Sequence, residues 1–144
     1  MGKEIERKYL VNSDEYKNRG RGVLIRQGFL TNNQNRVVRV RLYDDKGYLT
    51  IKGKTVGATR MEFEYEIPSD DAIHMLEELC VRPLIEKYRY KITYEGFLWE
   101  VDEFIGENQG LKIAEIELDN EEQAFDKPSW TGEEVTGQPQ YYNS

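Results

Sequence analysis

The chain has 144 residues, of which 33% are charged and 38% hydrophobic, and a formal net charge of −7. This acidic balance argues against a nucleic-acid-binding protein, which carries a basic footprint, and 12% aromatic residues argue against disorder. No apolar run approaches the ~20 residues that span a bilayer, and neither a signal-peptide pattern nor a second cysteine beside Cys80 indicates export. We therefore expect a single cytoplasmic domain over residues 1–144, without a membrane or nucleic-acid partner.

Alternation of apolar and polar residues with a period of two predicts strands along most of the chain. Eight such runs occur, at 4–11, 23–31, 36–43, 48–54, 59–67, 86–94, 97–104 and 110–118. Short polar turns join several of them, at 32–35, 44–47 and 95–96. Short connections favour antiparallel pairing, so we expect one antiparallel sheet, either an open meander or a closed barrel.

Helical patterns are few. The run at 70–80 has an apolar stripe at helical spacing, with a candidate N-cap at Ser69 or Asp70. A short helical turn is expected within 12–20, and the EEQAF run at 121–125 is a further helical candidate. The rest of the tail is expected to be irregular. The sequence thus predicts a mainly β (α+β) protein with a few flanking helices.

Residues i and i+2 of a strand point to the same side, and this rule sorts the ionic residues onto one face. Seven strands have one apolar face and one densely charged face, in which Ser, Thr and Asn are scarce. Bases and acids also separate by strand, as with Arg39 and Arg41 against Glu115 and Glu117. The charged face contains Glu4, Glu6, Lys8, Arg39, Arg41, Lys52, Lys54, Arg60, Glu62, Glu64, Lys87, Arg89, Lys91, Glu100, Asp102, Glu115 and Glu117.

Two interpretations fit this segregation. The charged face could be the solvated surface of an open sheet, or it could line the lumen of a closed barrel whose apolar side points outward. A charged lumen requires a charged ligand. Rows of Lys and Arg suit a phosphate chain, and clustered carboxylates suit Mg²⁺ or Mn²⁺. A metal ion and a polyphosphate together would neutralise both halves of the lining.

The EIERK motif at 4–8 resembles the ExExK signature of CYTH domains, the triphosphate tunnel metalloenzymes. Other similar segments follow over nearly the whole chain, namely IRQGFL (25–30), RVRL (39–42), TIK (50–52), RMEFE (60–64), EKYRY (86–90), WEVDEFIG (99–106), AEIEL (114–118) and GEEVTG (132–137). The resemblance implies an eight-stranded antiparallel closed barrel, a tunnel that binds a triphosphate and one or two divalent metal ions. The short chain and its IRQGFL and GEEVTG segments look most like inorganic triphosphatases, which hydrolyse triphosphate to diphosphate and phosphate.

The resemblance also implies roles for individual residues. The triphosphate-binding cations would be Lys8, Arg39, Arg41, Lys52, Lys87 and Arg89. The ligands of Mg²⁺ or Mn²⁺ would be Glu4, Glu6, Glu115 and Glu117, with Asp102 close by. The catalytic group is expected to be Glu4, Glu6, Lys8 and Glu117. None of these residues needs to act as a covalent nucleophile.

Three departures from the family pattern keep other functions open. Phe29 stands where the small triphosphatases often have a Tyr with an acid–base role, Gln140 precedes Tyr141 in place of Arg, and the sequence stops at Ser144. Proton transfer would then fall to metal-bound water or to another group. The alternatives are a class IV-type adenylate cyclase, another nucleotide or thiamine triphosphatase, and a non-catalytic module that binds polyphosphate or nucleotides. The oligomeric state stays open.

Overall fold

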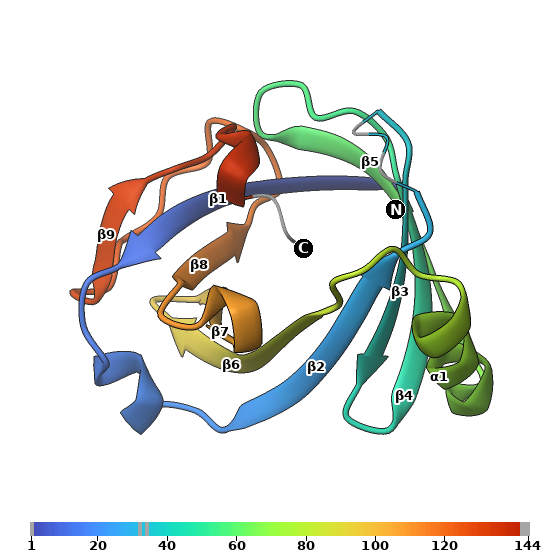
Figure 1. Cartoon of the computed structure of the whole chain (residues 1–144). Coiled ribbons are helices and arrows are strands. Elements are labelled where there is room, and N and C mark those ends of the chain that lie inside the picture. Colours follow the sequence, from blue (N-terminus) through green and yellow to red (C-terminus); the bar gives the residue numbers. More distant parts are fainter. Residues whose placement is uncertain (1, 32, 34, 142–144) are drawn as a thin grey trace.

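The computed structural model describes residues 2–31, 33 and 35–141, and Figure 1 views it along the axis of a closed β-barrel. The strands are β1 (Lys3–Val11), β2 (Gly22–Phe29), β3 (Val37–Tyr43), β4 (Lys46–Lys52), β5 (Thr59–Ile67), β6 (Ile85–Tyr94), β7 (Phe97–Ile105), β8 (Lys112–Glu117) and β9 (Thr131–Glu134). One α-helix, α1 (Ser69–Glu78), and three 3-10 helices, η1 (Glu15–Asn18), η2 (Gly106–Asn108) and η3 (Pro139–Tyr141), complete the fold. Within the described residues, no helix is both long and apolar enough to cross a membrane.

Strands β1 to β8 form the barrel, and every pairing is antiparallel. The strand order is β5-β4-β3-β2-β6-β7-β8-β1, and β1 closes the ring by pairing with β5. Residues 3–5 of β1 pair with β5, whereas residues 6–10 pair with β8. The closed barrel predicted by the resemblance is therefore confirmed, and the open meander is wrong.

The apolar faces of the strands point outward, and two separate layers cover parts of them. Helix α1 lies against β3 and β4, where Ala72 and Leu76 are fully buried with Val40. On the opposite side, the segment after β8 packs Trp130 against Trp99. These two layers form cores outside the barrel, so the barrel interior is left to the charged faces.

One end of the barrel interior is apolar. Ile85, Phe104 and Ile113 form a buried cluster there, against which Phe29 and Tyr141 pack. Each barrel residue of this cluster lies on the charged face of its strand, because two-residue alternation places Phe104 with Asp102 and Ile113 with Glu115. The lumen thus changes from charged to apolar along its axis, a feature that the sequence prediction missed.

The tail differs most from the prediction. Residues 131–134, expected to be irregular, form β9 and pair with the second edge of β1. Residues 121–125, expected to be helical, form a turn followed by irregular chain. Phe125 instead packs edge-on against Tyr9 and Trp99, so tertiary contacts with the aromatic cluster replace local helix formation.

Smaller differences concern the ends of elements. Helix α1 begins at Ser69, its N-cap is Pro68, and no side chain caps it, so the predicted cap at Ser69 or Asp70 is wrong. The turn expected at 44–47 is shorter, because β4 already begins at Lys46. The helical turn expected within 12–20 is confirmed as η1. The turn expected at 32–35 includes Asn32 and Gln34, which lie outside the described residues.

Candidate functional site

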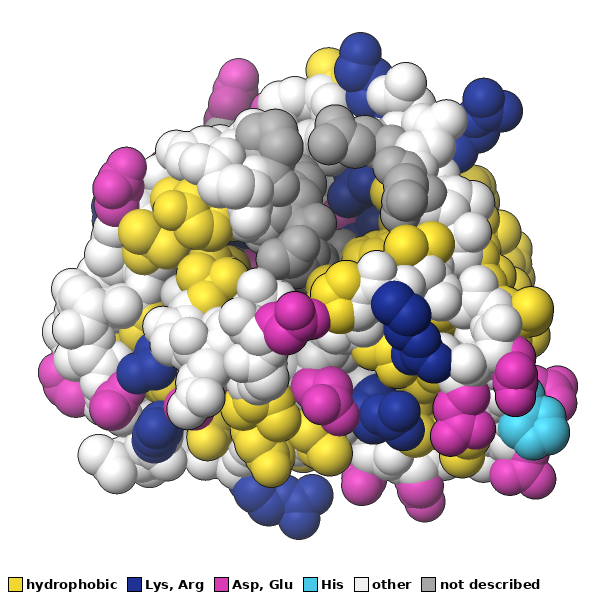
Figure 2. Space-filling model, in the orientation of Figure 1, with side chains coloured by type: hydrophobic (Ala, Val, Ile, Leu, Met, Phe, Trp, Pro, Cys, Tyr) yellow, Lys and Arg dark blue, Asp and Glu magenta, His cyan; other side chains and the backbone are white. Residues whose placement is uncertain are grey.

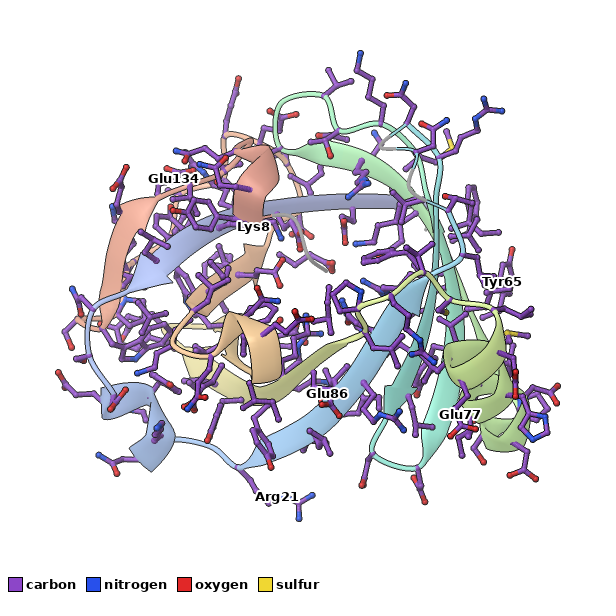
Figure 3. The ribbon with its side chains drawn as sticks, viewed as in Figure 1. Lys8, Arg21, Tyr65, Glu77, Glu86 and Glu134 are labelled. Carbon is purple, nitrogen blue, oxygen red and sulfur yellow. The ribbon has the colours of Figure 1, made fainter. Side chains whose placement is uncertain are left out.

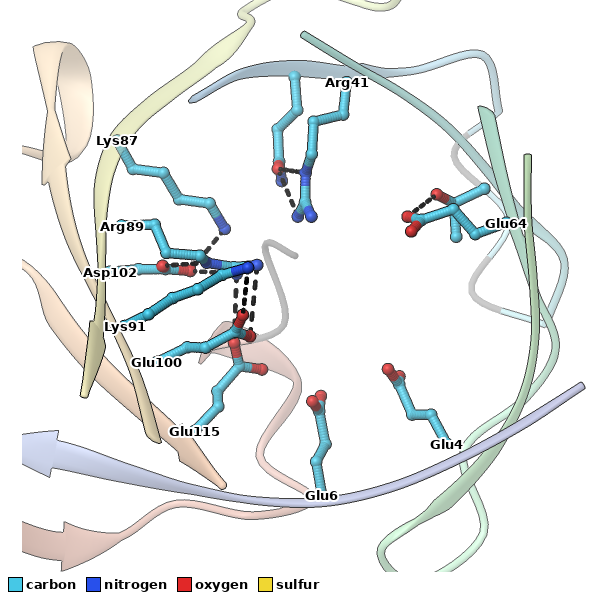
Figure 4. A network of polar contacts seen from close by, with 12 residues as sticks. Glu4, Glu6, Arg41, Glu64, Lys87, Arg89, Lys91, Glu100, Asp102 and Glu115 are labelled. Atoms are coloured by element: carbon cyan, nitrogen blue, oxygen red, sulfur yellow. Dashed lines mark hydrogen bonds and ion pairs between the residues drawn. The ribbon is translucent and has the colours of Figure 1, made fainter. Parts of the chain in front are cut away.

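The predicted site residues line the barrel interior, and all of them except Glu6 and Glu117 are buried. A cavity of about 260 Å³ runs between them. Figure 4 shows the arrangement across the lumen, with Arg41 and Lys87 on one side and Glu4 and Glu6 on the other. The cavity is lined by Glu4, Glu6, Arg39, Arg41, Lys52, Glu62, Glu64, Arg89, Leu98, Glu100, Glu115 and Glu117.

The basic side has donors that the described chain leaves unused. The Arg41 guanidinium donates to Gln27 Oε1 from Nε (3.0 Å) and Nη2 (2.9 Å), and it makes no ion pair with a described carboxylate. Arg39 Nε is buried without a hydrogen-bond acceptor. The Lys87 ammonium lies 2.7 Å from Asp102 Oδ2, but without hydrogen-bond geometry. Buried donors without acceptors are costly, so this wall is suited to an anion.

Asp102 holds two of the cations in place. The Arg89 guanidinium donates to both Asp102 oxygens, at 2.8 Å and 2.9 Å. This geometry follows from the strand register, in which Arg89 on β6 lies opposite Asp102 on β7. Because Lys87 approaches the same carboxylate, the structure places Asp102 among the cations of the basic side. Only 1% of its surface is exposed, which leaves its oxygens little access to the cavity.

The acidic side consists of carboxylates that are held by lysines. Lys8 Nζ contacts Glu6 Oε1 at 3.0 Å and also donates to Glu115. Lys52 of β4, which is separated from β1 by β5, reaches across to β1, and its Nζ contacts Glu4 Oε1 at 3.0 Å. Since Lys8 is the Cα partner of Glu115 and Glu6 that of Glu117, pairing of β1 with β8 brings the carboxylates of both strands together.

The crowding of these carboxylates changes their pKa values. Partial removal of Glu6 from water and the nearby charges of Glu115 and Glu4 raise the pKa of this half-buried carboxyl to about 8. Partial desolvation and the charges of Glu4 and Glu100 also raise the pKa of Glu117, although its side chain is more exposed. Burial acts in the same direction on Glu4, but the attraction of Lys52 outweighs it and lowers the pKa. The acidic side therefore favours an added positive charge.

The basic side shows the opposite effect. Burial lowers the pKa of Lys87 to about 7, since the attraction of Asp102 is offset by repulsion from Arg89 and Arg41. Burial and the neighbouring guanidinium groups likewise lower the pKa of Arg39 and of Arg41. Burial also disfavours charged Arg89, but Asp102 and Glu100 outweigh burial and raise its pKa. Positive charge is thus in excess around Arg41 and compensated at Arg89.

The structure adds residues that the sequence prediction did not include. Gln27 orients the Arg41 guanidinium, and Thr50 donates to Glu64 at 2.8 Å while accepting from Arg39 at 3.2 Å. Both polar residues could have been found by strand alternation, since Gln27 shares a face with Phe29, and Thr50 shares one with Lys52. Phe29 itself lies in the apolar cluster at the barrel end, where it supplies no proton donor.

The arrangement of β1, the cations and the lumen can now be compared with known proteins. The family model of the CYTH domain matches residues 2–142. The chain belongs to the CYTH domain family. Inorganic triphosphatase from Acetivibrio thermocellus is 58% identical over all of this chain and 92% of its own length. Inorganic triphosphatase from Nitrosomonas europaea is 35% identical, over 97% of this chain and 93% of its own length.

Solved CYTH-like structures agree on the fold. The crystal structure of the inorganic triphosphatase NE1496 superimposes with a TM-score of 0.69 at 33% identity, covering 96% of this chain and 93% of that chain. A putative adenylate cyclase from Bacillus halodurans has a TM-score of 0.66 at 20% identity, covering 85% and 84%. The second similarity shows a shared barrel only.

Proposed function

We infer that this CYTH domain is an enzyme that hydrolyses a triphosphate. Its two relatives named above are inorganic triphosphatases. The observation in the structure that carries the inference is the set of unused donors on one lumen wall. Arg39, Arg41 and Lys87 are buried there with more positive charge than the nearby carboxylates offset. A polyanion with several oxygens along its length is the ligand that such a wall accommodates.

The cations of the chain would bind and orient the substrate. Arg41, held in one orientation by Gln27, would donate to a phosphoryl oxygen together with Arg39 and Lys87. Charge on these oxygens grows during phosphoryl transfer, so donors fixed in advance stabilise the transition state. Lys8 and Lys52 are paired with carboxylates, and they would be available to contact the phosphates if those carboxylates held a metal ion.

We propose Mg²⁺ or Mn²⁺ as the cofactor, held by Glu4, Glu6, Glu115 and Glu117. The described residues contain no group of three or more His, Cys, Asp or Glu side chains arranged to hold a metal ion, and three of these carboxylates, Glu4, Glu6 and Glu115, instead contact lysines. Their chemistry fits a hard cation, because all donors are carboxylate oxygens and crowding raises the pKa of two of them. When bound, such an ion polarises a phosphoryl oxygen and lowers the pKa of bound water. Asp102, which is engaged with Arg89, is left out of this ligand set.

The substrate that we propose is free tripolyphosphate, cleaved to diphosphate and phosphate in the cytoplasm. Support comes from the short charged section of the lumen, which ends at the apolar cluster of Phe29, Phe104 and Ile113. An organic group at that end would have to displace packed side chains. A linear triphosphate requires only the charged section, where both its ends would meet cations.

The test is phosphate release from tripolyphosphate, ATP and thiamine triphosphate, with Mg²⁺ or Mn²⁺ varied and Glu6→Ala as the control. We expect fastest turnover of tripolyphosphate and loss of activity in the Glu6 variant. Chromatography of the ATP reaction separates cyclic AMP from ADP and phosphate, and the cyclic product would indicate a cyclase. Tight binding in calorimetry without turnover under either metal would identify a binding module and contradict the proposal.

A further inference from the structure

The outer face of β4 and β5 has an apolar strip that the rest of the described chain leaves largely exposed. It consists of Ile51, Met61, Phe63 and Tyr65, with 42%, 59%, 42% and 58% of their surfaces exposed. Ile51 is the Cα partner of Phe63, and the three β5 residues alternate along one face. Helix α1 covers only the adjoining part of the sheet (Figure 1). Hydrophobic side chains gather along the right edge of Figure 2, and Tyr65 points away from the barrel in Figure 3.

Opposite charges lie at the two ends of this strip. At the start of β5, Lys3 lies opposite Met61, and Arg36 directly precedes β3. At the end of β5, α1 follows at once and exposes acidic side chains, at Asp70, Asp71, Glu77 and Glu78. Neither Lys3 nor Arg36 forms an ion pair within the described chain, and the same holds for the four acids. In Figure 2, Lys and Arg side chains lie above the apolar edge and acidic ones below it.

We propose that this strip is the interface of a homodimer with two-fold symmetry. A two-fold axis through the middle of the strip lays it antiparallel on its copy, so that apolar residues meet apolar residues. The same rotation places Lys3 and Arg36 of one protomer beside the acidic face of α1 in the other. The surface is therefore complementary to itself in both polarity and charge. A contiguous exposed apolar patch with a charged rim is typical of a protein–protein contact.

The experiment measures mass by light scattering and sedimentation equilibrium over a range of concentrations. Wild type should reach twice the mass of the 17.0 kDa chain. Met61→Glu places a charge in the strip and should weaken the dimer at least about 30-fold, because the substitution occurs twice in a two-fold interface. Leu24→Glu makes the same change at an exposed site on β2 and should leave the dimer intact. A monomeric wild type at every concentration, or equal weakening by both variants, would overturn the proposal.

Charge exchange tests the orientation of the two copies. Lys3→Glu with Arg36→Glu should weaken the dimer, as should Asp70→Lys with Asp71→Lys, and both effects should fade at high salt. Combining all four substitutions restores opposite charges across the proposed contact and should recover most of the affinity. A combined variant no tighter than either pair would refute this orientation. Hydrolysis rates, which we expect to be unchanged because these residues lie outside the lumen, serve as the check on folding.

Discussion

Arg41 and Arg89 point into the same lumen, but replacing them should have opposite effects on stability. Arg41 is buried beside other cations and, among the described side chains, donates only to the neutral Gln27, whereas Arg89 donates to both oxygens of Asp102. At neutral pH the penalty for burying charged Arg41 is fully present, since its pKa, although lowered, stays above that pH. Arg41→Gln should therefore leave the ligand-free protein as stable as wild type or more stable. Arg89→Gln leaves buried carboxylates without their charge partner and should lower the free energy of unfolding by roughly 3–5 kcal/mol.

Both variants should lose activity. Each would remove one of the proposed charge-assisted hydrogen bonds to phosphate, worth about 1.5–3 kcal/mol, which corresponds to a decrease in kcat/KM of roughly 10- to 150-fold. Thermal unfolding without ligand distinguishes the two variants, because Arg89→Gln should lower Tm by roughly 10 °C, whereas Arg41→Gln should not lower it. An equal loss of Tm in both variants would refute the view that Arg41 lacks a partner before substrate binds.

Three further outcomes are expected. Glu115→Ala should lose most of the gain in Tm that metal plus tripolyphosphate gives wild type, and an undiminished gain would exclude Glu115 as a metal ligand. Since burial lowers the pKa of Lys87 to about 7, KM for tripolyphosphate should rise above that pH as the charge is lost, while ligand-free stability should increase as pH rises from about 7 toward the unfolded pKa. A KM for Lys87→Arg as pH-dependent as that of wild type would contradict this assignment. Leu76→Ala, in the core beneath α1, should cost about 2–5 kcal/mol of unfolding free energy with kcat/KM preserved; a fall in kcat/KM matching that of Arg41→Gln would show that α1 does more than pack.

The closed barrel was predicted by the resemblance to CYTH domains, because alternation left an open sheet possible as well. The charged face of each strand could be predicted from alternation, which assigns each strand residue to a face. The pairing of Lys8 with Glu115 could not, because it depends on the register between β1 and β8, which alternation does not determine. For the same reason, alternation could not show that Asp102 pairs with cations of the basic side, unlike the carboxylates that we propose as metal ligands. All of these carboxylates belong to the charged face, but the register between β6 and β7 places Asp102 beside Arg89 and Lys87.

Alternation also could not predict that one end of the lumen is apolar. Phe104 continues the face of Asp102, and Ile113 that of Glu115, but their common depth along the axis follows from the stagger of the strands. Strand β9 could not be predicted for a different reason. The TGEE segment at 131–134 has almost no apolar residues, so it shows no alternating pattern. It forms because the second edge of β1 offers backbone partners beyond the three residues that pair with β5.

Strand β1 also determines when in folding the site can exist. It carries Glu4, Glu6 and Lys8, and its partner β8 lies far along the sequence, with Lys8 and Glu115 separated by 107 residues. Until β1 and β8 pair, the charged faces of the intervening hairpins can remain hydrated, and the desolvation cost of the lumen is deferred to the closing step. Because that step joins segments so distant in sequence, it carries most of the loop-closure entropy and should be slow. In this barrel, completing the fold and assembling the charged site are therefore one kinetic event.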